Sequence, residues 1–236
     1  MQKQRGFTLV EIAIVLVIIG LLLGGILRGQ ELIQGARVRN LIDQQNGVRA
    51  AYFGFQDRFR ALPGDLTQAQ QAQIGSGVFV AIVGTAGNGA IEANDSSTAF
   101  QNLTVTGFLS CGVCTVAVAP STAANSPINV YGGVMQLVTD NALATGVATV
   151  SPAAQTNIKT GNAVPSNVLG EVDLKMDDGQ PYTGNFVFSL WAAAGPFPTQ
   201  ATCANAPTAT TSAWNKGQTS GIGGLVGTNC GGATKL

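Results

Sequence analysis

An unbroken apolar run dominates the start of the chain. In the 21 residues from Phe7 to Leu27, Glu11 is the only charged side chain. A helix of this length rises about 30 Å, which is the thickness of a bilayer's hydrocarbon core. A carboxylate inside such a run is costly in lipid, so Glu11 is expected to have a functional role. The pattern therefore predicts a transmembrane helix over residues 7–27.

The apolar pattern continues at helical spacing after the run ends. Its members are Leu32, Ile33, Ala36, Leu41, Ile42, Val48, Tyr52, Phe53, Phe55 and Phe59, and polar or charged residues fill much of the remainder. This amphipathic pattern gives the helix one face that can pack on a globular domain. No proline occurs before Pro63, which ends the helix. One continuous helix over residues 7–62, about 80 Å long, is predicted.

Short apolar runs of strand length follow after Asp65. They cover residues 78–83, 115–119, 130–138 and 186–191, and clusters of Gly, Asn, Pro and Ser separate them. Turns are predicted at Gly87-Asn88-Gly89 and at Asp177-Asp178-Gly179, and a short helix is predicted after Asp95. Residues 121–127 and 139–165 are expected to be mainly loops. The glycine-rich tail, residues 219–236, is expected to be held only through Cys230.

Charge and composition narrow the compartment and the partners. Charged residues make up 10% of the chain, the formal net charge is zero, and no Lys or Arg lies between Arg60 and Lys159. No basic surface for nucleic acid is expected. Lys3 and Arg5 precede the apolar run, which places the N-terminus in the cytoplasm by the positive-inside rule. The residues after Leu27 are then extracytoplasmic.

Four cysteines lie in this extracytoplasmic part: Cys111, Cys114, Cys203 and Cys230. Disulfides are the default outside the cytoplasm, and four cysteines allow three pairings. We favour Cys111 with Cys114 and Cys203 with Cys230, but the connectivity stays open. A zinc site would need a second C-x-x-C or histidines, and the chain has neither. A thioredoxin-like role for the C-x-x-C lacks the βαβ pattern that accompanies it.

The sequence offers little for catalysis. It contains no histidine, which excludes Ser-His-Asp and Cys-His arrangements, and it contains no phosphate-binding or dinucleotide-binding motif. We therefore expect no enzyme activity and no cofactor. The acidic residues cluster only at Asp173, Asp177 and Asp178, where three carboxylates make a weak calcium candidate. The spacing is not that of an EF-hand, and Asp-Asp-Gly is more often a hairpin turn.

The segment Gly6-Phe7-Thr8-Leu9-Val10-Glu11 resembles the processing site of the type IV pilin and type II secretion pseudopilin family. The resemblance implies that a prepilin peptidase cleaves between Gly6 and Phe7 and methylates the new N-terminal amine of Phe7. It also implies that Glu11 helps to register subunits in a filament. An ordinary signal peptide does not fit, because Arg28-Gly29-Gln30-Glu31 follows the run in place of a small-residue cleavage site. A plain signal anchor explains the run but neither Glu11 nor the Gly-Phe junction.

We thus expect an α+β, pilin-like fold with a long N-terminal helix packed on a C-terminal antiparallel sheet. Residues 1–6 are the expected leader, residues 7–62 the helix, and residues 63–236 an extracytoplasmic β-rich domain. The expected function is that of a pilin or minor pilin of a type IV pilus-like filament. The alternatives are a type II secretion pseudopilin and, from another class, a membrane-anchored adhesin or binding module.

The resemblance also implies the partners and the localisation. Expected partners are other pilin or pseudopilin subunits, prepilin peptidase, an inner-membrane assembly platform and membrane lipid. Before assembly the chain is expected to cross the bacterial inner membrane once. After assembly it is expected in a periplasmic or cell-surface filament.

Overall fold

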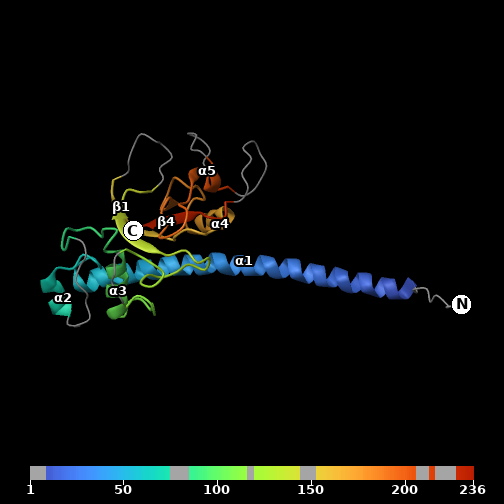
Figure 1. Ribbon diagram of the computed structural model, residues 1–236, viewed down its shortest axis with the longest axis horizontal. Coiled ribbons are helices and arrows are strands. Elements are labelled where there is room, and N and C mark those ends of the chain that lie inside the picture. The colour runs from blue at the N-terminus through green and yellow to red at the C-terminus, as the bar shows by residue number, and fades with distance from the viewer. Residues whose placement is uncertain (1–8, 75–84, 116–119, 144–152, 206–212, 216–226) are drawn as a thin grey trace. The chain divides into compact units, whose positions relative to one another are not determined.

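The computed structural model describes residues 9–74, 85–115, 120–143, 153–205, 213–215 and 227–236 (Figure 1). The chain divides into two compact units, Met1–Arg37 and Val38–Leu236. Helix α1, Leu9–Phe59, supplies residues to both units. The second unit therefore contains the last part of the long helix as well as the sheet.

Helix α1 confirms the prediction of one long helix without a break. It ends at Phe59, just before the expected boundary, because Arg60 adopts a positive φ of 54°. The amide of Arg60 still donates to the carbonyl of Gln56 at 2.9 Å, which closes the last turn. A single residue in the left-handed region is a common way for a helix to end.

The second unit is built on a four-stranded antiparallel sheet, which confirms the α+β layout. Its strands are β1 (Gln136–Asp140), β2 (Gln155–Lys159), β3 (Phe186–Ser189) and β4 (Gly231–Lys235), in the order β1-β2-β4-β3. The C-terminal strand β4 is thus central, between β2 and β3. Leu137 pairs with Ile158, Ile158 with Thr234, and Thr234 with Phe186, so these four residues share one face of the sheet.

That face of the sheet is covered by the part of α1 that belongs to the second unit. One core cluster joins Val38 and Leu41 of α1 to Phe186 and Phe188, and it includes Trp214. A second cluster joins further residues of α1 to strands β1 and β2; among its members are Val48, Tyr52, Phe55, Leu137 and Ile158. Between the clusters, the hydroxyl of Thr234 donates to the Gln45 side chain at 3.0 Å. Both residues are buried, so this polar contact is shielded from water.

Four shorter helices complete the second unit: α2 (Gln68–Ile74), α3 (Ser96–Val105), α4 (Ser166–Met176) and α5 (Gln200–Cys203). Helix α3 confirms the short helix expected after Asp95, although Asp95 makes no side-chain cap hydrogen bond. Helices α3 and α4 pack in the same two core clusters as α1, through Phe100 and Leu103 and through Val168, Leu169 and Val172. Figure 1 shows α4 close to β4 and α3 beside α1.

Several expectations for the β-rich part are wrong. The stretch over residues 139–165, expected to be mainly loop, also contains β2, and the glycine-rich tail, expected to be held only through Cys230, supplies strand β4. The strand expected over residues 130–138 lies later in the chain, because β1 begins at Gln136 and ends at Asp140. Asp177-Asp178-Gly179 is a turn, with Gly179 at a φ of 77°, but it joins α4 to β3 and not two strands of a hairpin.

Of the other expected strands and turns, one strand and one turn are confirmed. The run over residues 186–191 is confirmed by β3, which ends at Ser189. The turn at Gly87-Asn88-Gly89 is confirmed, with positive φ at both glycines. The expected strand over residues 78–83 lies outside the described residues, as does all but the first residue of the one over 115–119.

Candidate functional site

The expected processing and assembly residues lie at the start of α1. Gly6 and Phe7 fall outside the described residues. Glu11 lies in the first turn of α1 and is exposed. A carboxylate in the first turn interacts favourably with the helix dipole. Glu11 is thus at the end of the helix where a negative charge is least costly.

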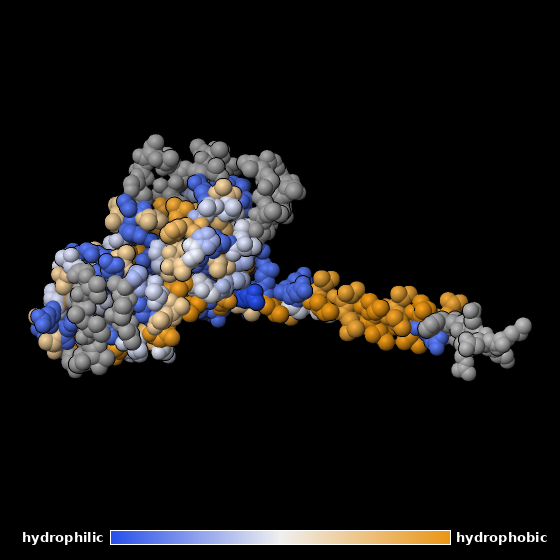
Figure 2. Space-filling model, in the orientation of Figure 1, coloured by the Kyte–Doolittle hydropathy of each residue, from blue (hydrophilic) through white to orange (hydrophobic). Residues whose placement is uncertain are grey.

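The apolar residues that follow Glu11 are exposed on every side of the helix. Those with large side chains are Ile12, Ile14, Val15, Leu16, Val17, Ile18, Ile19, Leu21, Leu22, Leu23, Ile26 and Leu27. Figure 2 shows this hydrophobic surface along the N-terminal part of α1. By length and composition the helix is able to cross a membrane, and none of its most apolar stretch is buried within the described structure. So large an exposed apolar surface is typical of a segment that lies in lipid or against other subunits.

A polar pair marks the end of the apolar run. Arg28 Nη1 lies 2.9 Å from Glu31 Oε2, one turn further along the helix. Both side chains are exposed, so the pair adds little to stability. The pair indicates where the membrane-spanning part of α1 ends, since charged side chains are unfavourable in the hydrocarbon region.

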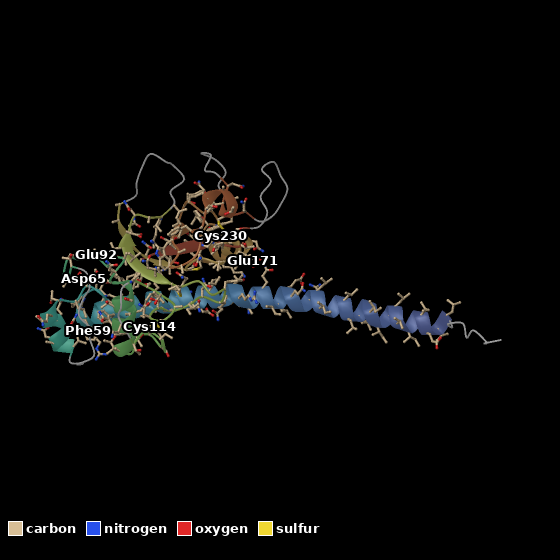
Figure 3. All side chains as sticks on the ribbon, viewed as in Figure 1. Phe59, Asp65, Glu92, Cys114, Glu171 and Cys230 are labelled. Carbon is tan, nitrogen blue, oxygen red and sulfur yellow. A yellow bond between two sulfur atoms is a disulfide. The ribbon has the colours of Figure 1, made fainter. Side chains whose placement is uncertain are left out.

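The structure joins the four cysteines in two disulfides. Cys111 is bonded to Cys114 and Cys203 to Cys230, with Cα–Cα distances of 5.3 and 5.6 Å. Both distances are usual for disulfides. Figure 3 labels Cys114, which packs in the cluster around Phe55, and Cys230, which directly precedes β4. The second disulfide therefore ties α5 to the start of the central strand.

The three aspartates of the calcium candidate are brought together. One carboxylate oxygen from each of Asp173, Asp177 and Asp178 lies within 4.8 Å of the others. Asp177 accepts hydrogen bonds from the backbone amides of Asn185 and Phe186, and Asp178 accepts one from Gln180. These bonds order the connection from α4 to β3. The calcium site at these residues stays a prediction.

Asp173 differs from its two neighbours because it is fully buried. Its carboxylate accepts a hydrogen bond from the Trp214 indole nitrogen at 2.6 Å and from the Gly179 amide at 3.2 Å. Burial raises the pKa of Asp173 to about 7; Asp178 and Asp177 also raise it, and the two hydrogen bonds oppose the rise. Nothing in the sequence pattern indicated the partnership with Trp214.

A second buried charge was also missed by the sequence reasoning. Lys159 on β2 is buried and its ammonium group is paired with the Asp140 carboxylate on β1. Burial lowers the pKa of Lys159, and the hydrogen bond and charge of Asp140 oppose this. The one available signal was that Lys159 is the first basic residue after Arg60 in a long stretch without positive charge.

The segment after α1 is held by a buried aspartate. The Asp65 carboxylate accepts hydrogen bonds from the backbone amides of Asn88 at 3.0 Å and Gly89 at 2.7 Å. The preceding Gly64 has a φ of 88°, and a Cβ there would lie 2.9 Å from the Asp95 carbonyl oxygen. The Leu62-Pro63-Gly64-Asp65 segment thus fixes the turn at Gly87-Asn88-Gly89 against the end of α1.

Comparison with known proteins gives one match. Residues 1–27 match the family model described as the prokaryotic N-terminal methylation motif. No curated protein and no solved structure matches the chain. The motif covers the junction at Gly6, the lone carboxylate and the apolar run described above. The chain therefore carries the signature of the type IV pilins and pseudopilins, which supports a subunit that prepilin peptidase processes and that assembles with other pilin-type subunits.

Proposed function

We propose that this chain is a structural subunit, a pilin or minor pilin, of a type IV pilus-like filament. One observation carries the proposal: the methylation motif at residues 1–27 includes an apolar run of α1 that is exposed on every side and contains a single carboxylate, Glu11. A helix of this kind needs lipid before assembly and other apolar helices after it. Both environments are those of a filament subunit stored in a membrane.

Processing follows from the position of the junction. Lys3 and Arg5 keep the N-terminus in the cytoplasm, where prepilin peptidase cleaves between Gly6 and Phe7 and methylates the Phe7 amine. The second unit then lies outside the inner membrane. An assembly platform in that membrane draws the apolar helix out of lipid and into the filament. The subunit ends in a periplasmic or cell-surface filament.

Two roles are considered for Glu11, one within its own helix and one between subunits. Within its own helix it complements the dipole, which stabilises by about 0.3–1 kcal/mol. Between subunits it is able to pair with the charged amine of Phe7 of a neighbouring copy, which sets the axial register. A carboxylate in an apolar run is costly in lipid, and the full positive charge of an amine on a neighbouring copy offsets that cost more than the partial charge of the helix dipole does. We therefore assign Glu11 the intersubunit role.

Processing and assembly are tested with three variants. Gly6→Val is expected to accumulate with its leader uncut, whereas the unmodified chain begins at N-methylated Phe7 on N-terminal sequencing and mass spectrometry. Glu11→Ala is expected to insert and be cleaved but to be nearly absent from sheared filaments. Glu31→Ala, which removes an exposed carboxylate beyond the apolar run, serves as the control and should be incorporated normally. Incorporation of Glu11→Ala at wild-type levels contradicts the intersubunit role.

The same motif occurs in type II secretion pseudopilins. A pilin and a pseudopilin are therefore distinguished by the kind of filament that contains the chain. For a pilin, electron microscopy of sheared surface filaments followed by mass spectrometry should identify this chain as a component. For a pseudopilin, deleting the chain should abolish secretion of folded exoproteins while no surface filament contains it. A membrane-anchored adhesin would remain in the envelope as separate subunits.

A further inference from the structure

A groove of about 590 Å³ lies within the second unit, beside α1. Val48 and Met135 are buried members of its lining, and Val113 and Ile128 are apolar members with 43% and 40% of their surface exposed. The Cys111–Cys114 disulfide turn also lines the groove, and the Gln44 side chain is tied to the Ile128 carbonyl at 3.3 Å. The groove is therefore a formed surface feature with an apolar lining.

The groove has an unbalanced charge. Among the described residues, Asp43 is the one ionisable residue that lines the groove apart from the bonded cysteine, and none of the lining side chains is basic. Asp43 is exposed, and the described part of the chain offers it no ion pair within 4 Å. An occupant that fits this surface supplies a cation beside an apolar or aromatic group.

Helix α1 carries a cation beside an aromatic ring at a position outside the groove. The Arg49 guanidinium lies over the Phe53 ring, 5.9 Å from its centroid, and both side chains are exposed. Neither residue lines the groove, and Arg49 has no ion pair among the described residues. Arginine and aromatic side chains are the groups most enriched at the centres of protein interfaces.

The groove and the Arg49–Phe53 pair lie on different sides of α1, since Asp43 and Arg49 are six residues apart, or about 120° around the helix. Gln44 and Phe53 are nine residues apart, which is about 2.5 helical turns, so their side chains project from opposite sides. A protein with a receptor surface on one side and the matching surface on the other forms a heterologous contact. Such contacts repeat without closing when the rotation between copies does not complete a ring, and they then generate open filaments.

We propose that the groove of one subunit receives Arg49 and Phe53 of a second copy of this chain in the filament. The guanidinium of Arg49 then faces Asp43, and the Phe53 ring packs on Val113 and Ile128. Asp43 and Arg49 are six residues apart, so parallel copies joined in this way are offset by about 9 Å along the helix. The inference rests on the proposed filament function and adds the contact that the second unit makes.

Disulfide cross-linking tests the contact in assembled filaments. The test uses the Asp43→Cys/Arg49→Cys double variant of the full chain. Within one helix the Cα atoms of the two new cysteines are separated by about 9 Å along the axis, which exceeds the roughly 7 Å that a disulfide spans. The two cysteines are therefore able to bond only between copies. The native cysteines are already paired and do not compete. We expect a ladder of dimers, trimers and larger species on non-reducing gels of sheared filaments.

The controls separate a specific contact from chance collision. Each single cysteine variant is limited to dimers. The Asp43→Cys/Asp57→Cys variant moves the second cysteine about 12 Å along the helix and should give no ladder. Filaments that form normally without a ladder from Asp43→Cys/Arg49→Cys overturn the contact and leave the filament function intact. If the unmodified chain enters no filament, the proposed function and the contact both fail.

Charge reversal gives an independent result. Asp43→Arg and Arg49→Glu should each reduce incorporation into filaments by about tenfold or more, because like charges that meet across an interface are strongly unfavourable. The Asp43→Arg/Arg49→Glu double variant restores opposite charges and should recover most of the loss. Wild-type incorporation of either single variant, or failure of the double variant to recover, contradicts the pairing.

Discussion

The side chains that sequence reasoning missed are buried ionisable groups held by partners far away in the chain. Asp173 on α4 is held by Trp214, which is 41 residues away, and Lys159 by Asp140 on the neighbouring strand. Burying a charge is unfavourable unless it is paired or hydrogen-bonded. The partners become visible only when the chain is folded, because no periodicity in the sequence brings them together.

We expect Asp173 to make the stability of the second unit depend on pH. Its pKa is raised to about 7 in the folded chain, while an unfolded aspartate titrates near about 3.9. Between these values the folded state keeps a proton that the unfolded state has lost. The stabilisation is therefore complete below about pH 3.9 and is lost as pH rises to about 7. The loss is at most roughly 4 kcal/mol, from about three pKa units at 1.36 kcal/mol each.

Asp173→Asn isolates this effect from the other titrating groups. The neutral amide mimics the protonated acid and still offers an oxygen to the Trp214 indole nitrogen. Thermal unfolding of both proteins between pH 4 and pH 8 should show the wild type losing stability relative to Asp173→Asn as pH rises, with a plateau above about pH 7. A constant difference across this range would show that Asp173 is ionised throughout.

Helix α1 was predicted well because its signal is local and repeated. The apolar run and the amphipathic pattern each persist over several turns, and Pro63 limits the helix from the C-terminal side. The predicted end was late only because Arg60 takes a left-handed conformation, which arginine rarely adopts. The candidate site followed from the same signal, since the motif, Glu11 and the apolar run are contiguous.

Strand β4 could not be predicted because it has no strand-like sequence. It consists of Gly231-Gly232-Ala233-Thr234-Lys235, without a large apolar residue, yet it is central in the sheet. A Cβ at Gly232 would lie 2.3 Å from Cζ of Phe186, so glycine leaves the room that the ring occupies. Strand β2 has one large apolar residue, Ile158, and its other face carries Asn157 and Lys159. Tertiary packing overrides local propensity in both strands.

The disulfide that precedes β4 compensates for this weak strand. Cys203 and Cys230 are 27 residues apart, and closing such a loop stabilises by about 3.5 kcal/mol in the chain-entropy model. The Cys111–Cys114 loop has a separation of three residues, for which the same model gives about 2 kcal/mol. We expect Cys203→Ala/Cys230→Ala to lower the free energy of unfolding in urea more than Cys111→Ala/Cys114→Ala does.

Peptide mapping of the unmodified protein under non-reducing conditions provides the necessary check on connectivity. It should recover one peptide pair linked through Cys203 and Cys230 and one loop closed by Cys111 and Cys114. Any peptide that joins a cysteine of one pair to a cysteine of the other rules out this connectivity. Equal losses of stability in the two double variants would instead mean that loop length does not determine the contribution.

At the scale of the whole molecule, the two units differ in how their apolar side chains are shielded from water. In the first, Met1–Arg37, the described residues 9–37 expose their large apolar side chains and none of them is buried. The second, Val38–Leu236, has its own core, in which α1 supplies Val38, Leu41, Val48 and Tyr52. The first depends on lipid or on other subunits, whereas the second needs neither for its core.

The second unit should therefore fold alone when the fragment Val38–Leu236 is exported to the periplasm behind a cleavable signal. We expect a soluble monomer by size-exclusion chromatography, with one cooperative thermal transition and both disulfides formed. A fragment that begins at Phe53 is the matched control, because it lacks the core residues Val38, Leu41, Gln45, Val48, Ala51 and Tyr52. Removing several buried side chains costs far more than the usual stability of a domain, at about 2–5 kcal/mol for each large one, so the control should be unfolded or degraded. Aggregation of the longer fragment would show that the second unit requires the preceding part of α1, and a stable shorter fragment would show that the helix is not part of its core.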